Sequence, residues 1–344
     1  LTSANSLVGS IAFEGSRGGG VVALTNGNYV AYSPFWSTGF PGAVGAATFC
    51  SGLTGCTGTA SAANSLIGTT RQDQVGLDVT PLDDGSYVVH SPSWDKGAVK
   101  DVGAMTWCNG TTGCPPGPVT VDNSLTGVTT SDTIGGDFVD NVFVPVPVVP
   151  LPGGAFVFKS PYFNVPFIPR GGAVTWCGAG GAGCTGAPVS SANSLLAQRQ
   201  FEIQLGPPIV PLQTGAFVIG LPYWNVGGAV VFCDPVTHCR GQKINSTITM
   251  IGFRVDDGVG TRVTALTNGD FVVESPSWNS SVGTGVRTLG AATFCSGTSG
   301  CPSFVSITNS LDSNGIGALE RMRASGLGLR TVSSPSTPRS MLPL

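Results

Sequence analysis

One sequence pattern recurs five times along this chain, and it constrains the fold more than any other feature. Each copy contains Asn-Ser-Leu, a run of the type Val-Thr-x-Leu-x-x-Gly-x-(Tyr/Phe)-Val-Val-x-Ser-Pro-x-Trp, and a run of the type Gly-Ala-x-Thr-(Trp/Phe)-Cys. The proline of the Ser-Pro-x-Trp element recurs at spacings of 54 to 69 residues. A period of this length predicts a repeat architecture in which each copy forms one supersecondary unit.

Each unit divides into four predicted strands. Asn26-Gly27 separates "VVAL" from "YVAYSP", and Asn-Gly or Asp-Gly between β-branched runs is a strong hairpin signal that returns at Asp84-Gly85 and Asn268-Gly269. A second hairpin is predicted around a pair of cysteines in each unit. Two hairpins per unit predict a four-stranded antiparallel sheet. Helical periodicity is nearly absent, so the predicted fold class is all-β.

We predict that residues 1–344 form a single β-propeller domain whose blades are these four-stranded sheets. The predicted units span 11–66, 67–125, 126–195, 196–247 and 248–311. Residues 312–337 align with the first hairpin of a unit, and residues 1–10 repeat the last strand, so a degenerate sixth blade is predicted to combine both termini. Closing a ring in this way protects strand edges. A five-bladed ring, an open or superhelical array and a parallel β-helix are the alternatives.

All ten cysteines belong to the repeated pattern, in pairs separated by five or six residues. The predicted disulfides are Cys50–Cys56, Cys108–Cys114, Cys177–Cys184, Cys233–Cys239 and Cys295–Cys301. Opposed residues of antiparallel strands lie at a distance that a disulfide can bridge, whereas zinc sites favour shorter spacings and a second pair of ligands. Five such bonds predict an oxidising compartment, and therefore an extracellular or cell-surface location.

The composition excludes several classes of partner. Charged residues make up 10% of the chain, the net charge is −3, and no run of Lys or Arg could follow a phosphate backbone, so no nucleic-acid partner is expected. No stretch reaches the roughly 18 apolar residues that a membrane span needs. The sequence predicts neither a nucleic-acid-binding protein nor a membrane-spanning one.

Side chains at fixed positions of the repeat are the candidates for binding. Trp36, Trp94, Trp224 and Trp278 of the Ser-Pro-x-Trp element are candidates for stacking on sugar rings, although packing between neighbouring sheets is the favoured interpretation. The aromatic residue before the first cysteine is expected to pack against the next blade, and the Asn of Asn-Ser-Leu to bond backbone groups. Three sequons predict N-glycosylation at Asn109, Asn245 and Asn279.

Recognisable catalytic motifs are missing from the sequence. There is no G-x-S-x-G, no H-E-x-x-H and no P-loop, and His90 and His238 occupy unrelated positions of the repeat. The acidic pairs Asp83-Asp84 and Asp256-Asp257 lie beside glycines without the spacing of a calcium loop, so they are expected in solvated turns. No catalytic residue, metal site or cofactor is predicted, and the chain is predicted not to be an enzyme.

The segments "NSLVGS", "VVALTNGNYVAYSPFW" and "GAVGAATFC" resemble a repeat of large secreted proteins of the filamentous-haemagglutinin-like kind. The likeness covers nearly all of residues 1–311, and the cysteine pairs depart from it. The resemblance implies an extracellular propeller array with a surface or matrix role and without assigned catalysis.

The sequence therefore predicts a non-enzymatic extracellular module with a structural or adhesive role, as a subunit of a surface appendage, sheath or filament. Its expected partners are further copies of itself or other surface proteins. The alternative is a lectin-like propeller that binds glycans through the repeated tryptophans.

Overall fold

The computed structural model of the chain describes most of the repeat region. The described residues are 2–9, 18–37, 42–139, 142–204, 206, 209–244, 248–280, 287–288 and 290–312. Residues 313–337 of the predicted sixth unit and the sequon residue Asn245 lie outside this part.

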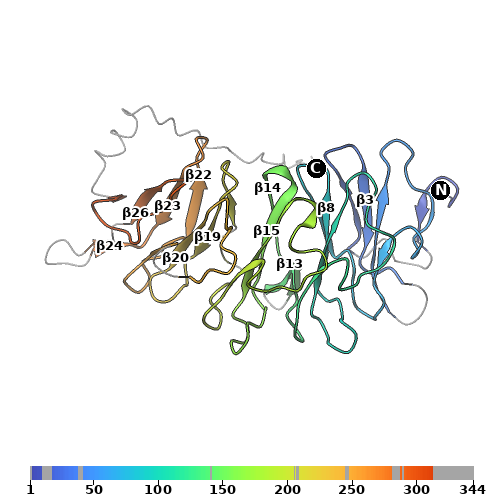
Figure 1. Cartoon of the computed structure of the whole chain (residues 1–344), viewed down its shortest axis with the longest axis horizontal. Coiled ribbons are helices and arrows are strands. Elements are labelled where there is room, and N and C mark those ends of the chain that lie inside the picture. Colours follow the sequence, from blue (N-terminus) through green and yellow to red (C-terminus); the bar gives the residue numbers. More distant parts are fainter. Residues whose placement is uncertain are drawn as a thin grey trace, which may run out of the picture.

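Five antiparallel sheets, one for each repeat, form the body of the structure (Figure 1). The first contains β2 (Gly20–Ala23), β3 (Tyr29–Ser33), β4 (Ala46–Cys50) and β6 (Leu66–Ile67). The second contains β7 (Asp78–Pro81), β8 (Tyr87–Ser91), β9 (Ala104–Cys108) and β11 (Leu125–Thr126). The third contains β14 (Val148–Leu151), β15 (Ala155–Ser160), β16 (Ala173–Cys177) and β17 (Ser194–Leu196).

The last two sheets repeat the same order of strands. The fourth contains β18 (Val210–Pro211), β19 (Phe217–Leu221), β20 (Ala229–Cys233) and β21 (Thr249–Ile251). The fifth contains β22 (Arg262–Ala265), β23 (Phe271–Ser275), β26 (Ala291–Cys295) and β27 (Ser310–Asp312). These sheets confirm the prediction of an all-β chain built from four-stranded antiparallel units.

Shorter elements connect or flank the sheets. They are β1 (Leu7–Val8), β5 (Gly58–Thr59), β10 (Gly117–Pro118), β12 (Gly136–Val139), β13 (Val142–Pro145), β24 (Asn279–Ser280), β25 (Arg287–Thr288) and the 3-10 turns η1 (Pro152–Gly154) and η2 (Ala179–Gly181). The hairpin of β12 and β13 is the insertion that makes the third repeat longer than the others.

The five sheets follow one another in an open row. The first strands of neighbouring sheets approach each other, as β2 approaches β7 and β18 approaches β22. The first and fifth sheets lie at opposite ends of the long axis of the molecule (Figure 1), and no strand of the described ranges pairs one with the other. The described chain therefore has propeller-like units without a closed ring, and the six-bladed ring stays a prediction.

The core lies between the sheets, because alternate residues of each strand point to opposite faces. We call the face directed at the next repeat the forward face and the face directed at the preceding repeat the rear face. Four buried clusters fill the four junctions. In the first junction, the forward face of the first sheet contributes Val30, Ala47 and Leu66, and the rear face of the second contributes Tyr87, Val89, Ala104 and Cys108.

The last strand of each unit also reaches into the next unit. β6 pairs in parallel with β10 of the second repeat, and Thr126 and Ile251 form parallel bridges to Pro188 and Phe304 of their following repeats. β1 pairs with β5 of the first repeat in the same parallel way. β1 therefore lies where the last strand of a preceding unit would lie.

Candidate functional site

Each unit carries one disulfide across its second hairpin. The five bonds join Cys50 to Cys56, Cys108 to Cys114, Cys177 to Cys184, Cys233 to Cys239 and Cys295 to Cys301, with Cα–Cα distances of 4.5 to 5.6 Å. These are the within-unit pairs expected from the spacing, and no free cysteine is found among the described residues. Such bonds are typical of proteins in oxidising compartments.

The Asn-Ser-Leu motif organises the outer edge of each sheet. Oδ1 of Asn123 accepts a hydrogen bond from the Thr120 N–H at 2.9 Å, and its Nδ2 donates to the Pro118 carbonyl at 2.9 Å. The serine hydroxyl pairs with the threonine of Gly-Ala-x-Thr at 2.7 to 2.9 Å in four units: Thr48–Ser65, Thr106–Ser124, Thr175–Ser194 and Thr293–Ser310. The motif therefore bonds backbone and neighbouring strands.

A buried carboxylate at each junction was missed by sequence reasoning. Oδ2 of Asp132, in the loop after β11, accepts hydrogen bonds from the Val128 and Thr129 N–H groups, both at 2.7 Å, and Oδ1 accepts one at 2.9 Å from the Asn164 N–H, in the loop after β15 of the next sheet. The equivalent residues are Asp73, Glu202 and Asp257. We call these four side chains the junction carboxylates, because each one ties the loop that follows one sheet to the next sheet.

The expectation of solvated turns is therefore wrong for Asp257, which is 1% exposed. The available signal was an acidic residue one or two positions before a valine or isoleucine, as in Asp73-Gln-Val75 and Asp132-Thr-Ile134. Glu202 stands one residue nearer to its isoleucine, and its longer side chain reaches the same place. Because of this shift, Glu202 does not align with the three aspartates when the repeats are compared by sequence.

The tryptophans of Ser-Pro-x-Trp are mostly buried. Trp36, Trp94 and Trp278 are 4%, 4% and 7% exposed. Trp224 is half-buried, and its Nε1 donates to Glu202 Oε1 at 2.6 Å. Trp94 and Trp278 pack between sheets, whereas Trp36 packs on residues of its own unit, and the set leaves no repeated series of open rings for sugars.

The aromatic residue before the first cysteine packs onto the next repeat. Phe49 stacks on Tyr87 with ring centroids 6.5 Å apart, and Phe232 stacks on Phe271 at 6.0 Å. Phe49 also lies beneath the disulfide-closed turn of the next repeat, where a methyl group on Gly113 would come within 2.6 Å of its Cβ. The disulfide turn thus forms a lid over an aromatic ring of the preceding unit.

The predicted glycosylation sites differ in access. Asn109 is exposed in a disulfide turn, where its Oδ1 accepts hydrogen bonds from the Thr111 and Thr112 N–H groups at 2.7 and 3.0 Å. Asn279 is half-buried, and its N–H donates to the junction carboxylate Asp257 at 3.3 Å. Asn109 is therefore the more accessible of the two.

Two buried bases occupy the same position on the forward faces of their sheets. Burial lowers the pKa of His90 to about 4, because the imidazolium would lose its water, while nearby Asp78 opposes the shift. Burial lowers the pKa of Lys159 to about 8. His90 Nε2 lies 3.0 Å from Thr80 Oγ1. Both bases are inside junctions, so their protonation is coupled to the packing of neighbouring sheets.

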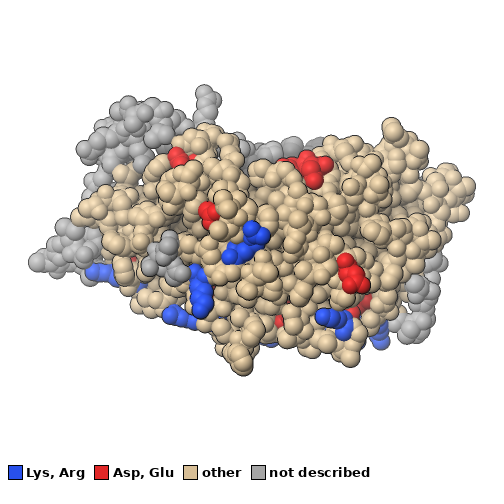
Figure 2. Space-filling model, in the orientation of Figure 1, with Lys and Arg blue, Asp and Glu red and all other residues tan. Residues whose placement is uncertain are grey.

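The surface carries few and scattered charges (Figure 2). Within the described ranges, no three His, Cys, Asp or Glu side chains are grouped to hold a metal ion. The same part of the chain has no helix with the length and apolar character of a membrane span.

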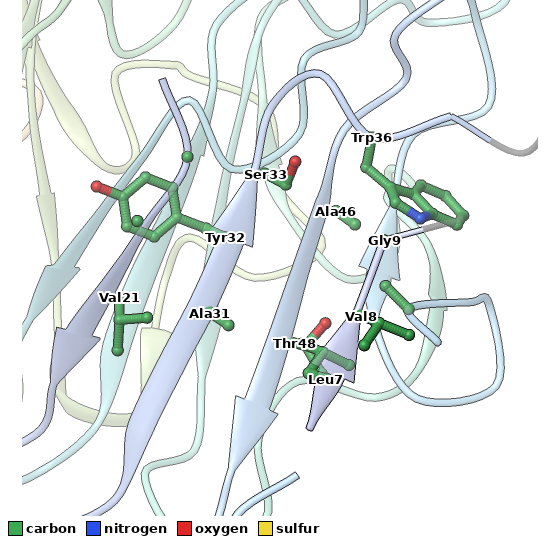
Figure 3. Close-up of a pocket in the computed structure, with 13 residues that line it drawn as sticks. Leu7, Val8, Gly9, Val21, Ala31, Tyr32, Ser33, Trp36, Ala46 and Thr48 are labelled. Carbon is green, nitrogen blue, oxygen red and sulfur yellow. The ribbon is translucent and has the colours of Figure 1, made fainter. Parts of the chain in front are cut away.

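Two grooves are lined by apolar side chains. The first, of about 250 Å³, lies on the rear face of the first sheet, between Leu7 and Val8 of β1 and the residues Val21, Ala31 and Thr48 (Figure 3). The second, of about 760 Å³, lies beside Phe163 and the loop 164–169, in which Phe167 is fully exposed. The first groove marks the place where a preceding sheet would pack.

Comparison with known proteins identifies the repeat. A family described as "Repeat of unknown function (DUF5650)" matches residues 23–77, 81–136, 150–201, 211–261 and 265–316, more than half of the chain. The chain belongs to this repeat family. No curated protein matches the sequence.

One similar solved structure is an endo-arabinase from Bacteroides thetaiotaomicron VPI-5482. The match has 11% identity and a TM-score of 0.28, and it covers 81% of this chain and 93% of the other. The prediction that the chain is not an enzyme is corrected by this match, because the similar structure is that of an enzyme. A TM-score this low assigns neither an activity nor a substrate to the present chain.

Proposed function

We propose that this chain is a structural or adhesive module of an extracellular assembly, such as a surface appendage, a sheath or a filament. One observation carries the proposal: the side chains that recur in the repeat are used to join one unit to the next. The aromatic before the cysteine, the junction carboxylate and the disulfide turn each take part in a junction. A chain that uses its recurring residues in this way is suited to form an extended, mechanically continuous body.

The proposed location rests on the disulfides and on the resemblance of the repeat to large secreted proteins. A short disulfide-closed loop contributes about 2 kcal/mol by restricting the unfolded chain. Five of them would add on the order of 10 kcal/mol, comparable with the net stability of a domain. Such reinforcement suits a protein that works outside the cell, where it is not protected or replaced by cellular quality control.

The glycan-binding alternative receives less support. Stacking on sugars requires open aromatic faces, and three of the four candidate tryptophans, Trp36, Trp94 and Trp278, are buried. Only Trp224 is partly accessible, which leaves a single site where the alternative needs several.

The proposal is tested by immunogold electron microscopy on cells of the organism that makes the chain. We expect label on an appendage, sheath or filament outside the cell, and loss or thinning of that structure when the gene is deleted. If the deletion strain keeps the appendage, sheath or filament but its cells no longer attach to surfaces, the role is adhesive and not structural. Label confined to the cell interior would contradict the proposal.

A further inference from the structure

The two ends of the row expose faces that are covered at every internal junction. Within the described residues, no sheet covers the rear face of the first sheet or the forward face of the fifth sheet. Phe294, the last aromatic of the series that packs on following repeats, is 37% exposed, and Val272 beside it is only partly buried. The described part of the chain therefore presents one unpaired forward face and one unpaired rear face.

The unpaired forward face repeats a face that is already paired within the chain. The first sheet packs forward with six side chains: Val22, Val30, Tyr32, Ala47, Phe49 and Leu66. The fifth sheet has the same residue types at four of these register positions, which are Val272, Ala292, Phe294 and Leu311, whereas Thr264 and Glu274 replace Val22 and Tyr32. The fifth sheet thus carries four of the six side chains that the first sheet uses to bind the second.

The unpaired rear face likewise repeats the face that receives them. The second sheet receives the first with Tyr87, Val89, Ser91, Ala104, Thr106 and Cys108. The first sheet has Tyr29, Ala31, Ser33, Ala46, Thr48 and Cys50 at these positions, a difference of one residue in six. Gly55, in the disulfide turn above this face, has a positive φ of 70°, as Gly113 has one of 79°, and among the described residues no side chain of a preceding unit packs against it.

We propose that the chain binds a second copy of itself head to tail, with the forward face of the fifth sheet of one copy on the rear face of the first sheet of the next. Phe294 of one copy packs under the disulfide turn at Gly55 of the other, as Phe49 packs under Gly113. The contact is heterologous and the row is open, so repetition builds a filament and not a closed dimer. This inference rests on the proposed structural role and names the partner that it requires.

β1 occupies part of the proposed interface. Its Asn5-Ser6-Leu7 has the sequence of Asn309-Ser310-Leu311, and both asparagines accept a hydrogen bond from the N–H three residues before them, at 3.0 and 2.9 Å. β1 is held by a parallel ladder of only two residue pairs. In the head-to-tail contact, β27 of the incoming copy replaces β1 on β5.

The test combines two variants of the full chain, each with one face disabled. Phe294→Asp places a charge on the forward face, and Ala31→Arg places one on the rear face. The mass of each protein is measured by sedimentation over a concentration series up to the millimolar range, and the assemblies are imaged by negative-stain electron microscopy. Phe167→Asp is the matched control, because Phe167 is a fully exposed phenylalanine in the third repeat.

We expect the unmodified chain and Phe167→Asp to form rods whose mass grows by whole chains. Each single-face variant should stay monomeric, with an association constant at least about thirtyfold weaker, as for loss of one interface hot spot. A mixture of the two variants should form a one-to-one dimer, because each retains the face that the other lacks. Removal of residues 1–8 should strengthen association. Circular dichroism and thiol titration verify that each variant is folded and oxidised.

Three results would overturn this inference. The unmodified chain could remain monomeric throughout, the mixture could fail to form the dimer, or association could appear only after removal of residues 313–344. The last result would mean that the chain's own end covers Phe294, as in the predicted six-bladed ring. A monomeric chain that still labels an extracellular structure would refute the head-to-tail contact alone, whereas rods of a chain confined to the cell interior would refute the proposed function alone.

Discussion

The first and second repeats have nearly the same sequence in their central strands, yet they differ in burial. All five residues of β8, YVVHS, are buried, whereas in β3, YVAYS, only Val30 is. The second sheet lies between two others, while among the described residues the first sheet has a neighbouring sheet on its forward face alone. The burial of a repeat is therefore decided by the unit beside it, as in arrays where each unit contacts only its nearest neighbours.

The largest expected effect comes from removing the same tyrosine from both repeats. Tyr87 is fully buried, and its hydroxyl accepts the Cys114 N–H at 3.2 Å, whereas Tyr29 is partly exposed. Tyr87→Ala should lower the free energy of unfolding by about 3–5 kcal/mol, and Tyr29→Ala by about 1 kcal/mol. Urea unfolding of both variants measures the difference. Equal losses would show that the rear face of the first sheet is covered in solution.

The second prediction concerns pH and the position that is His90 in the second repeat and Tyr32 in the first. The folded pKa of His90, about 4, lies below the unfolded value of 6.5, so the unfolded chain takes up the proton first as the pH falls. Stability should therefore decline between about pH 6.5 and 4, by roughly 3 kcal/mol in total, and level off below that range.

The midpoint of urea unfolding should depend less on pH in His90→Gln than in the unmodified chain. This substitution keeps a polar group near Thr80 Oγ1. His238→Gln is the comparison variant: burial and the nearby Arg240 also lower the pKa of His238, but this side chain is only partly buried, so its substitution should change the pH profile less. A pH dependence that survives in His90→Gln would assign the effect to other groups, such as His238.

A third prediction separates two contributions to stability: the loss of entropy that a disulfide imposes on the unfolded chain, and the burial of the disulfide turn by a neighbouring sheet. The disulfides Cys50–Cys56 and Cys108–Cys114 have the same sequence separation of 6 residues. Replacing either pair by serine should cost about 2 kcal/mol, because the entropy term depends on loop length and not on the neighbouring sheet. Thermal unfolding of the two double variants provides the comparison. A much larger loss in the second repeat would indicate that its turn acts mainly as a lid over Phe49.

Much of the fold could be predicted from the sequence, because it depends on local rules. Asn26-Gly27 and its equivalents mark hairpins, alternation marks the faces of strands, and the cysteine spacing predicts the bonded pairs. Whether the row closes depends on the angle between neighbouring sheets, which is set by the packing of many side chains at each junction. No single residue encodes that angle. The sequence therefore predicts the open row only as an alternative to the closed ring.

The junction carboxylates show a second limit. Their role depends on N–H groups that lie beside the next sheet, such as that of Asn164 for Asp132. A scan for local motifs cannot detect a contact between residues more than thirty positions apart. The change from Asp to Glu202, with its shift of one position, further weakens the pattern. Only the three-dimensional structure, in which neighbouring sheets lie side by side, shows the contacts across a junction.

The smallest expected effect is a difference between two glycines at equivalent positions of the disulfide turns in the first and second repeats. Gly55 and Gly113 have φ values of 70° and 79°, so alanine at either position strains the backbone by about 1 kcal/mol. At Gly113 the added methyl would also come within 2.6 Å of Phe49, whereas at Gly55 the nearest atom, the Tyr29 hydroxyl, is 3.6 Å away. Gly113→Ala should therefore cost about 1 kcal/mol more than Gly55→Ala in dilute solution, as measured by urea unfolding. The difference should shrink as the protein concentration rises, because Phe294 of a second copy would then cover Gly55. A difference that does not change with concentration would mean that the two turns never acquire the same surroundings.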